Sequence, residues 1–226
     1  MKLNPRLSLI ASYVKKGSAA ADIGTDHGYL PVYLAENDIC RNIIATDINE
    51  GPLNNAIETA KNAGVFDKIS FFLTDGLSGV PADSADTVII AGMGGETMEG
   101  ILKGAPWLKN ENTHLILQPQ SKIEELVSWL LREKFYIFDA ELVREYGRIY
   151  LVIQAGYGKN DGQDSDILDI LFRKKAPLLK EALDREIIKN EKILLNLQAS
   201  LNTGAEIKNT EDKLKKLKKM RGEMEN

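Results

Sequence analysis

A series of short apolar runs, most of them followed by a segment with helical spacing, limits the folds open to this chain. The runs predict strands at residues 19–23, 42–46, 68–73, 86–90 and 114–117. Helices are expected at residues 29–36, 51–62, 96–103 and 121–134. The last of these is expected to begin with a capping box of Ser121 and Glu124. Nearly continuous apolar strands separated by helices are typical of a parallel sheet covered on both faces, so the sequence predicts an α/β fold with five parallel strands.

Two more strands, at residues 136–142 and 148–154, follow with no helix between them. They are therefore expected to form a hairpin that closes the sheet, with one strand antiparallel to the rest. Near the other end of the chain, Asn4 and Pro5 predict the start of a short helix before the first strand. The whole arrangement resembles the Rossmann-like sheet of class I methyltransferases, which use S-adenosyl-L-methionine (SAM).

A glycine-rich linker at residues 156–162 precedes a helical C-terminal part. Residues spaced by three or four predict a coiled-coil seam with one polar member: Phe172, Ala176, Leu179, Leu183, Ile187, Asn190, Leu194, Leu197 and Leu201. A shorter second helix is predicted from Ile207, Leu214, Leu217 and Met224. The break at residues 202–204 favours an antiparallel helical hairpin. We therefore predict a SAM-binding catalytic domain over residues 1–158 and a coiled-coil domain over residues 163–226.

The charge of the chain is unevenly distributed. The 226 residues carry a net charge of −4, with 15 Lys and Arg against 21 Asp and Glu in residues 1–162, and 14 against 12 in residues 163–226. This balance does not predict a broadly basic nucleic-acid surface, so any RNA contact would depend on local patches. One such patch is the last predicted helix, which holds Lys213, Lys215, Lys216, Lys218, Lys219 and Arg221. These cations are interpreted either as a solvated face or as contacts to RNA phosphates.

Several common kinds of site are not expected here. Cys40 is the only cysteine and His27 and His114 are the only histidines, so the sequence predicts neither a disulfide nor a metal site. No apolar run approaches the roughly 20 residues that cross a membrane. The N-terminus lacks the apolar core of a signal peptide. We therefore expect a cytoplasmic protein without a membrane partner.

The loop after the first strand points to a positively charged ligand. It reads Gly24-Thr25-Asp26-His27-Gly28, with Asp26 where a dinucleotide-binding loop has its second glycine. A carboxylate at that place repels a pyrophosphate and attracts a cation. SAM carries a sulfonium and an ammonium group, so the loop favours SAM over a nicotinamide dinucleotide.

Other polar or small residues follow the remaining strands. Asp47 follows the second strand at the spacing of an acid that binds ribose hydroxyls, and its alternative role is to cap the next helix. Asp75, with Gly76 and Leu77, is suited to an adenine ring or to a simple turn. Small residues around Met93, at positions 91–95, permit a close approach of the backbone to a ligand. Because parallel strands end at one edge, these residues are expected to share one crevice.

These stretches resemble the bacterial tRNA (adenine-22, N1)-methyltransferases over nearly the whole chain. The matching stretches are Arg6-Leu7 with residues 11–14, residues 21–31, residues 47–53, residues 75–77, residues 90–95 and residues 117–120. The family is expected to have Asn where this chain has Gln120. The resemblance implies a SAM-dependent enzyme that methylates N1 of an adenine in the D-arm region of tRNA, a coiled-coil domain that helps to hold tRNA, and no metal.

The resemblance also implies site residues. Catalytic roles fall to Asp26, Tyr29 and Met93. Cofactor binding falls to Asp22, Gly24, Thr25, Asp26, His27, Gly28, Asp47, Ile48, Asp75, Gly76, Leu77, Ala91, Gly92, Met93 and Gly94. Substrate binding falls to Arg6, His27, Gln118, Pro119, Lys215, Lys216 and Lys219.

Two alternatives stay open at this point. One is a SAM-dependent methyltransferase of another substrate, and the other is a non-catalytic RNA-binding scaffold with a degenerate Rossmann domain. The sequence leaves the oligomeric state, monomer or weak dimer, undetermined.

Overall fold

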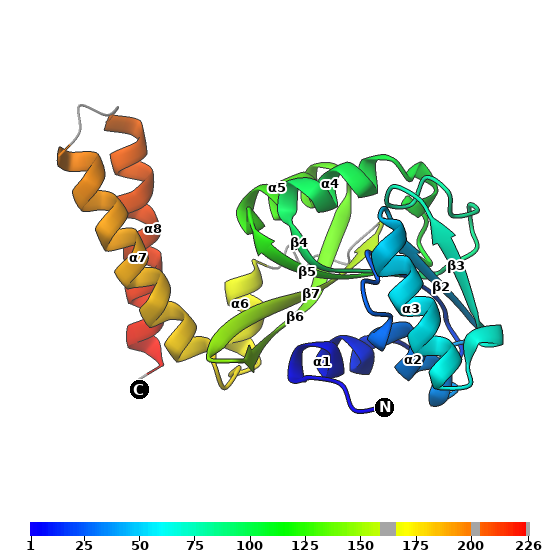
Figure 1. Ribbon diagram of the computed structural model, residues 1–226. Helices are drawn as coiled ribbons and strands as arrows, with labels where there is room; N and C mark the ends of the chain where they lie inside the picture. Colours follow the sequence, from blue (N-terminus) through cyan, green and yellow to red (C-terminus); the bar gives the residue numbers. More distant parts are fainter. Residues whose placement is uncertain (159–165, 200–203, 225–226) are drawn as a thin grey trace. The chain divides into compact units, whose positions relative to one another are not determined.

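The computed structural model describes residues 1–158, 166–199 and 204–224 (Figure 1). Contacts between Cα atoms divide the chain into two compact units, Met1–Ile170 and Leu171–Asn226. The first unit contains the whole sheet, and the second contains the two long C-terminal helices.

The first unit is built on a seven-stranded sheet with the order β3-β2-β1-β4-β5-β7-β6. Its strands are β1 (Ala19–Ile23), β2 (Asn42–Asp47), β3 (Ile69–Leu73), β4 (Thr87–Gly94), β5 (His114–Ser121), β6 (Phe135–Glu145) and β7 (Arg148–Tyr157). The first five strands are parallel, and β7 lies antiparallel between β5 and β6. The predicted class I methyltransferase sheet with its closing hairpin is thereby confirmed.

Helices cover both faces of this sheet. They are α1 (Pro5–Tyr13), α2 (Tyr29–Glu36), α3 (Glu50–Asn62), α4 (Gly95–Lys103) and α5 (Ile123–Arg132), with short 3-10 turns η1 (Phe66–Lys68) and η2 (Pro106–Leu108). Figure 1 shows α4 and α5 on one face and α1, α2 and α3 on the other. The start of α1 is as predicted, because Asn4 Oδ1 accepts a hydrogen bond of 2.8 Å from the Leu7 amide.

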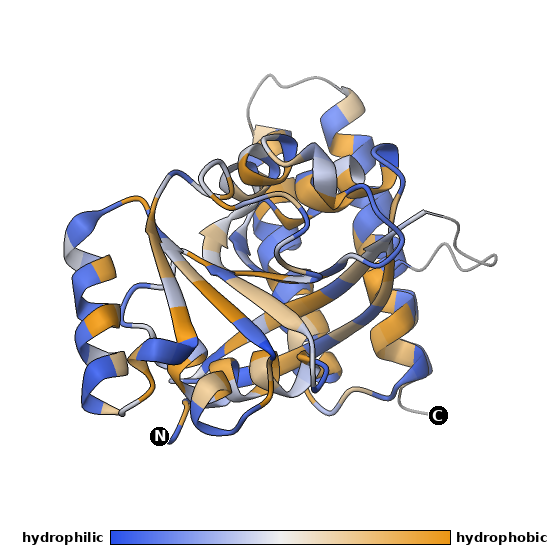
Figure 2. Cartoon of the chain, turned by 90° about the vertical axis from the view of Figure 1, so that its right-hand side faces the viewer, coloured by the Kyte–Doolittle hydropathy of each residue, from blue (hydrophilic) through white to orange (hydrophobic). Residues whose placement is uncertain are grey.

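The core explains why the strands are apolar runs. All five residues of β1 are buried, and so are the first six of β5. Ile89, Ile116 and Leu117 are fully buried because helices pack against both faces. The helices instead alternate hydrophobic and hydrophilic residues, as the hydropathy colours of Figure 2 show.

The ends of β4 and β5 differ from the prediction. Both strands were expected to stop near residues 90 and 117, but they stay paired as far as Gly94 and Ser121. Ser121 is therefore a strand residue, and the predicted capping box with Glu124 is wrong. Lys122, with a φ of 55°, precedes α5 instead, and no side chain caps this helix.

The closing hairpin is also longer than predicted. The strands β6 and β7 pair from Phe135 opposite Tyr157 to Glu145 opposite Arg148. Only Tyr146 and Gly147 lie between the two strands.

The second unit contains the predicted helical hairpin, but its first helix is shorter. Phe172 lies on α6 (Ile167–Arg173), and Ala176 lies between this helix and α7 (Leu179–Ala199). The predicted continuous seam from Phe172 is therefore wrong, since Pro177 disfavours a helix through this point. Leu201 and residues 202–203 are outside the described part.

The helices α7 and α8 (Gly204–Glu223) pack along a buried seam. It contains Leu179, Leu183, Asn190, Leu214, Leu217 and Met220. Met220 thus lies in the seam, whereas the predicted Met224 is half-buried. Ion pairs that join the helices include Arg221 Nε with Asp184 Oδ1 at 2.6 Å and Lys218 Nζ with Glu191 Oε1 at 2.7 Å. No helix in the described residues is both long and apolar enough to cross a membrane.

Candidate functional site

A cavity of about 670 Å³ opens at the carboxyl ends of the parallel strands. Its volume lies within the range of about 300–1,000 Å³ that is usual for small-molecule sites. The predicted site residues that line it are Arg6, Asp22, Gly24, Thr25, Asp26, His27, Tyr29, Asp47, Ile48, Asp75, Gly76, Ala91, Gly92 and Met93. The predicted crevice and most of its predicted residues therefore come together at one edge of the sheet.

Gly24 and Met93 lie close together in the wall of this cavity. Gly24 has a φ of 72°, and a Cβ at this position would collide with Met93 Cε. The backbone after β1 is thus bare, and the methionine side chain from β4 lies against it. The left-handed backbone favours glycine here, and any larger residue would also have to move the end of the Met93 side chain.

Asp47 is held in place by backbone amides. Its Oδ1 accepts a 2.9 Å hydrogen bond from the Asn49 amide, and its Oδ2 accepts one of 3.3 Å from the Asp26 amide. The helix α3 begins at Glu50 with Asn49 as its N-terminal flanking residue, so Asp47 is not the cap. A buried carboxylate fixed in this way keeps further lone pairs to accept ligand hydroxyls.

The buried carboxyl of Asp22, in the cavity wall, has a shifted pKa. Burial raises the pKa of this carboxyl to about 6, and the nearby charge of Asp47 contributes to the rise. The Thr25 hydroxyl partly opposes the pKa shift. A positively charged ligand would stabilise the ionised carboxylate, so this acid favours a cationic guest.

Three side chains of the loop after β1 stand at the rim of the cavity. Asp26 has a φ of 51° and an exposed side chain, with its Oδ2 atom 3.8 Å from His27 Nε2. The His27 ring stacks on the Tyr29 ring, with 5.4 Å between the centroids. Tyr29 is itself 46% exposed. The rim therefore offers a carboxylate and two aromatic faces to an incoming ligand.

Arg6 has a more defined position than its sequence context indicates. Its side chain is only 19% exposed, and its Nη1 donates a 2.8 Å hydrogen bond to Gln118 Oε1. Its Nε lies 3.6 Å from Glu145 Oε1, and its guanidinium lies 5.5 Å from the centre of the Tyr150 ring. Arg6 is therefore a cation that three partners fix in the cavity wall, and not a freely solvated charge.

Five predicted site residues of this unit do not line the cavity: Gly28, Leu77, Gly94, Gln118 and Pro119. Gly28 instead allows α2 and α3 to pack, since a Cβ there would lie 2.8 Å from the Ala56 Cα. Leu77, Gln118 and Pro119 are buried. The predicted substrate-binding lysines Lys215, Lys216 and Lys219 are exposed on α8, in the second unit.

The cavity also contains residues that were not predicted. They include Asn4, Leu7, Thr46, Asn49, Pro52, Thr74, Thr97, Ile101 and Gln120. Gln120 is exposed, and its Nε2 would lie 3.6 Å from a Cβ on Gly92. Gln118 and Gln120 are two residues apart on β5, so a regular strand would place both side chains on the same face. The pairing of β5 with β4 is irregular after Ala91, however. This irregularity, which the sequence does not reveal, places one amide inside the fold and the other in the cavity.

A second cavity, of about 360 Å³, lies near the amino ends of β2 and β3. Two of its lining cations are already paired, Lys68 with Asp38 and Arg41 with Asp86. Across the described residues, no group of three His, Cys, Asp or Glu side chains is arranged to hold a metal ion. The larger cavity is therefore the candidate site.

Comparisons with known proteins agree with this geometry. Residues 3–153 match the family described as "Methyltransferase domain". The tRNA (adenine(22)-N(1))-methyltransferase of Bacillus subtilis is 30% identical over 226 residues, which is all of this chain and 95% of the relative. The solved B. subtilis m1A22 tRNA methyltransferase TrmK is 28% identical, with a TM-score of 0.85 over 97% of this chain and 99% of the other.

A Streptococcus pneumoniae protein, solved in complex with S-adenosyl-L-methionine, is 29% identical, with a TM-score of 0.79 over 96% of this chain and 98% of the other. Since the match to the B. subtilis relative runs through the whole sequence, the chain belongs to the tRNA (adenine(22)-N(1))-methyltransferase family of class I methyltransferases.

Proposed function

We propose that the protein transfers a methyl group from SAM to N1 of adenine 22 in tRNA. The observation that carries this function is the cavity at the sheet edge, where Asp22, Asp26, Asp47 and Asp75 surround a glycine-lined wall. Its donor set fits SAM, because carboxylates suit the ribose hydroxyls and the cationic groups of that molecule. When bound, SAM supplies an electrophilic methyl group.

The roles of the acids follow from their positions. Asp47, held by two backbone amides, accepts the ribose hydroxyls. Asp75 accepts from the exocyclic amine of the cofactor adenine, and Ile48, which is 61% exposed at the cavity, packs on the ring. Asp22 and Asp26 favour the positively charged end of the cofactor. Gly24 and Gly92 allow the backbone to approach it.

Methyl transfer to adenine N1 requires little proton transfer by the protein. Adenine N1 has a lone pair in the plane of the ring, so it can attack the methyl group directly without a general base. The methylated base is positively charged, and Asp26 near it would stabilise the developing charge. Tyr29 and Met93 position the target ring against the donor.

The target adenine has to leave any base pair, because N1 lies on its Watson–Crick edge. The exposed rings of Tyr29 and His27 at the rim suit an extruded base. Lys215, Lys216 and Lys219 on α8 are proposed to contact tRNA phosphates. In this proposal residues 1–158 are the catalytic domain and residues 163–226 are the coiled-coil domain for tRNA.

Methyl transfer to an unmodified tRNA transcript tests this function. The wild-type protein should form 1-methyladenosine at position 22, and a transcript with guanosine 22 should receive none. The Asp26→Asn variant should lose most activity, whereas Asp83→Asn is the matched control, since Asp83 is also exposed with a positive φ of 61°. Methylation at another position, or none, would contradict the proposal.

A further inference from the structure

The hairpin of β6 and β7 continues beyond its pairing with β5, on the side of the cavity. The pairing of β5 with β7 ends at Leu117 opposite Ile153, whereas β6 and β7 stay paired as far as Glu145 opposite Arg148. Residues 148–152 of β7 thus extend roughly 16 Å beyond that pair at about 3.3 Å per residue. Because β7 is antiparallel to β5, this extension runs toward the carboxyl ends of the parallel strands, where the cavity lies.

The extension is fixed to the cavity wall through Arg6. Glu145, the last residue of β6, is buried, and its Oε2 accepts a 3.1 Å hydrogen bond from the Arg6 amide. The Arg6 guanidinium lies near the carboxylate of Glu145 and over the Tyr150 ring of β7. The turn of the hairpin therefore begins one residue after a contact with a residue that lines the site.

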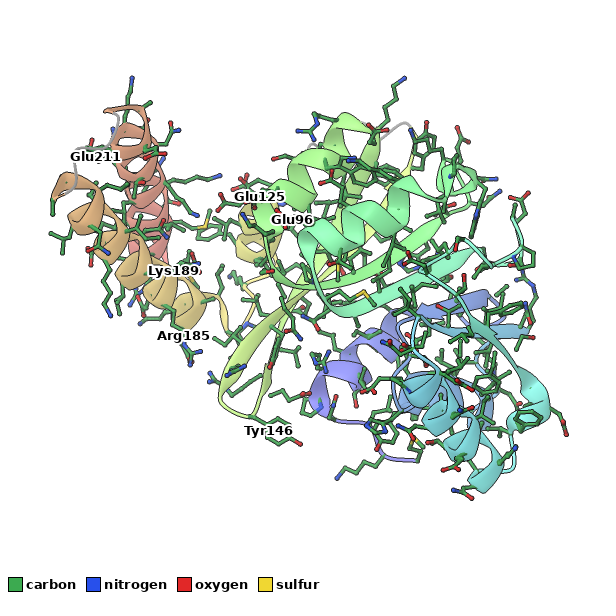
Figure 3. All side chains as sticks on the ribbon, turned by 45° about the horizontal axis from the view of Figure 1, so that its top comes forward. Glu96, Glu125, Tyr146, Arg185, Lys189 and Glu211 are labelled. Atoms are coloured by element: carbon green, nitrogen blue, oxygen red, sulfur yellow. The ribbon has the colours of Figure 1, made fainter. Side chains whose placement is uncertain are left out.

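Tyr146, in the turn of the hairpin, is an unusual residue for this position. Tyr146 is 92% exposed, and Figure 3 shows it at the end of the hairpin. Its φ is 46° and that of Gly147 is 74°, which is the pattern of a two-residue turn that normally selects Asn-Gly. A tyrosine in this turn has a strained backbone and buries almost none of its ring, so it contributes little to the isolated fold.

Its neighbours carry positive charge. Arg144 and Arg148 flank the turn, and both are exposed. The intervening Glu145 is turned to Arg6. The turn of the hairpin thus holds an aromatic ring between two arginines, on a unit whose overall charge is acidic.

We propose that this hairpin end, residues 144–148, is a tRNA-binding element in which the Tyr146 ring stacks on a nucleotide next to the target adenosine. This inference rests on the proposed function. An extruded base leaves its neighbours unstacked, and an aromatic face a short distance from the cavity offers them a replacement surface. Arg144 and Arg148 contact the flanking phosphates.

The Tyr146→Asn variant separates binding from folding. Asn suits the left-handed turn, so the melting temperature should stay the same or rise. The KM for tRNA should increase about tenfold, as expected for the loss of one stacked base, and the KM for SAM should not change. The Tyr146→Phe variant keeps an aromatic face and should behave like the wild type.

Phe66→Asn serves as the matched control, since Phe66 is a partly exposed aromatic residue just before β3, at the opposite edge of the sheet. It should leave the KM for tRNA unchanged. For Arg148→Gln, the dependence of tRNA affinity on salt should weaken by the equivalent of about one phosphate contact.

A KM for tRNA within twofold of wild type in Tyr146→Asn would overturn the role of the hairpin end. Equal increases in Tyr146→Asn and Tyr146→Phe would overturn the stacking. Absence of tRNA methylation by the wild-type protein would instead overturn the proposed function itself, so the two failures are distinguishable.

Discussion

The Met93 side chain lies directly against Gly24, so that a single added methyl group on the glycine would collide with Met93 Cε. The two residues come from β4 and from the turn after β1, which are neighbouring strands of the sheet. Both residues line the cavity. Substitutions at either residue should therefore change ligand binding more than they change the fold.

The Gly24→Ala variant tests this contact. Its SAM dissociation constant should rise at least tenfold, because the Cβ displaces Met93 and the backbone is left-handed. Gly17→Ala is the control, since Gly17 has a φ of 85° and open space around its Cβ position. Both variants should lose about 1–2 kcal/mol of stability from the backbone strain. Equal SAM affinities, measured by calorimetry, would contradict the prediction.

The buried acid Asp22 predicts a particular pH dependence of stability. Its pKa is raised to about 6, above an unfolded value of about 3.9. Its contribution to stability is therefore fully present below about pH 4 and is lost as the pH rises through 6. Asp22→Asn should be more stable than the wild type at pH 7.5 by up to about 3 kcal/mol, and the difference should vanish near pH 4.

Urea unfolding between pH 4 and 8 measures this difference. Asp38→Asn is the control, since Lys68 lowers the pKa of the exposed Asp38 and its pH effect has the opposite sign. SAM affinity of the wild type should rise with pH through about 6, while that of Asp22→Asn stays flat. A pH-independent stability difference would contradict the prediction, because it would mean that Asp22 has the same pKa in the folded and unfolded states.

The two glutamines at the end of β5 should respond differently to truncation. Gln118 is fully buried and accepts from Arg6, so Gln118→Ala leaves a buried guanidinium short of a partner and should cost about 1–3 kcal/mol of stability. Gln120 is exposed in the cavity, so Gln120→Ala should keep the melting temperature. Its kcat/KM for tRNA should fall about tenfold, since an amide can read the adenine edge. Thermal unfolding and steady-state kinetics on both variants decide the assignment.

The lysines of α8 give a prediction about salt. Lys215→Ala should weaken tRNA binding and lower the slope of log affinity against log salt by about one unit. Lys192→Ala removes the same charge from an exposed position on α7, and it should have a smaller effect. Filter binding at several salt concentrations measures both slopes. Identical slopes for the two variants would show that tRNA does not distinguish the helices.

Local patterns were enough to predict most of the sheet. Buried strands such as β1 are apolar throughout, and Asn4 next to Pro5 marks a helix start by its own chemistry. The ends of β4 and β5 were not predictable, because Gly92, Gly94 and Pro119 read locally as loop residues. Their pairing depends on the neighbouring strand and is therefore a property of the assembled sheet.

In the candidate site, too, local patterns predict some residues, whereas the positions of others depend on distant parts of the chain. Strand-end acids such as Asp22 and Asp47 could be predicted, since the carboxyl ends of parallel strands meet at one edge. The setting of Arg6 could not, because its partners Gln118 and Glu145 lie 112 and 139 residues away in the chain. Gly28 matched a ligand-binding pattern, but the structure uses it to let α3 approach α2.

The four carboxylates around the cavity have a consequence for turnover. Methyl transfer converts the sulfonium of SAM into a neutral thioether, so the spent cofactor carries one positive charge fewer than the one that entered. In the proposed binding mode, Asp22, buried beside Asp47, then loses a counter-charge and is again penalised for being ionised. We therefore expect the fixed charge of the wall to favour the sulfonium reactant over the neutral thioether product.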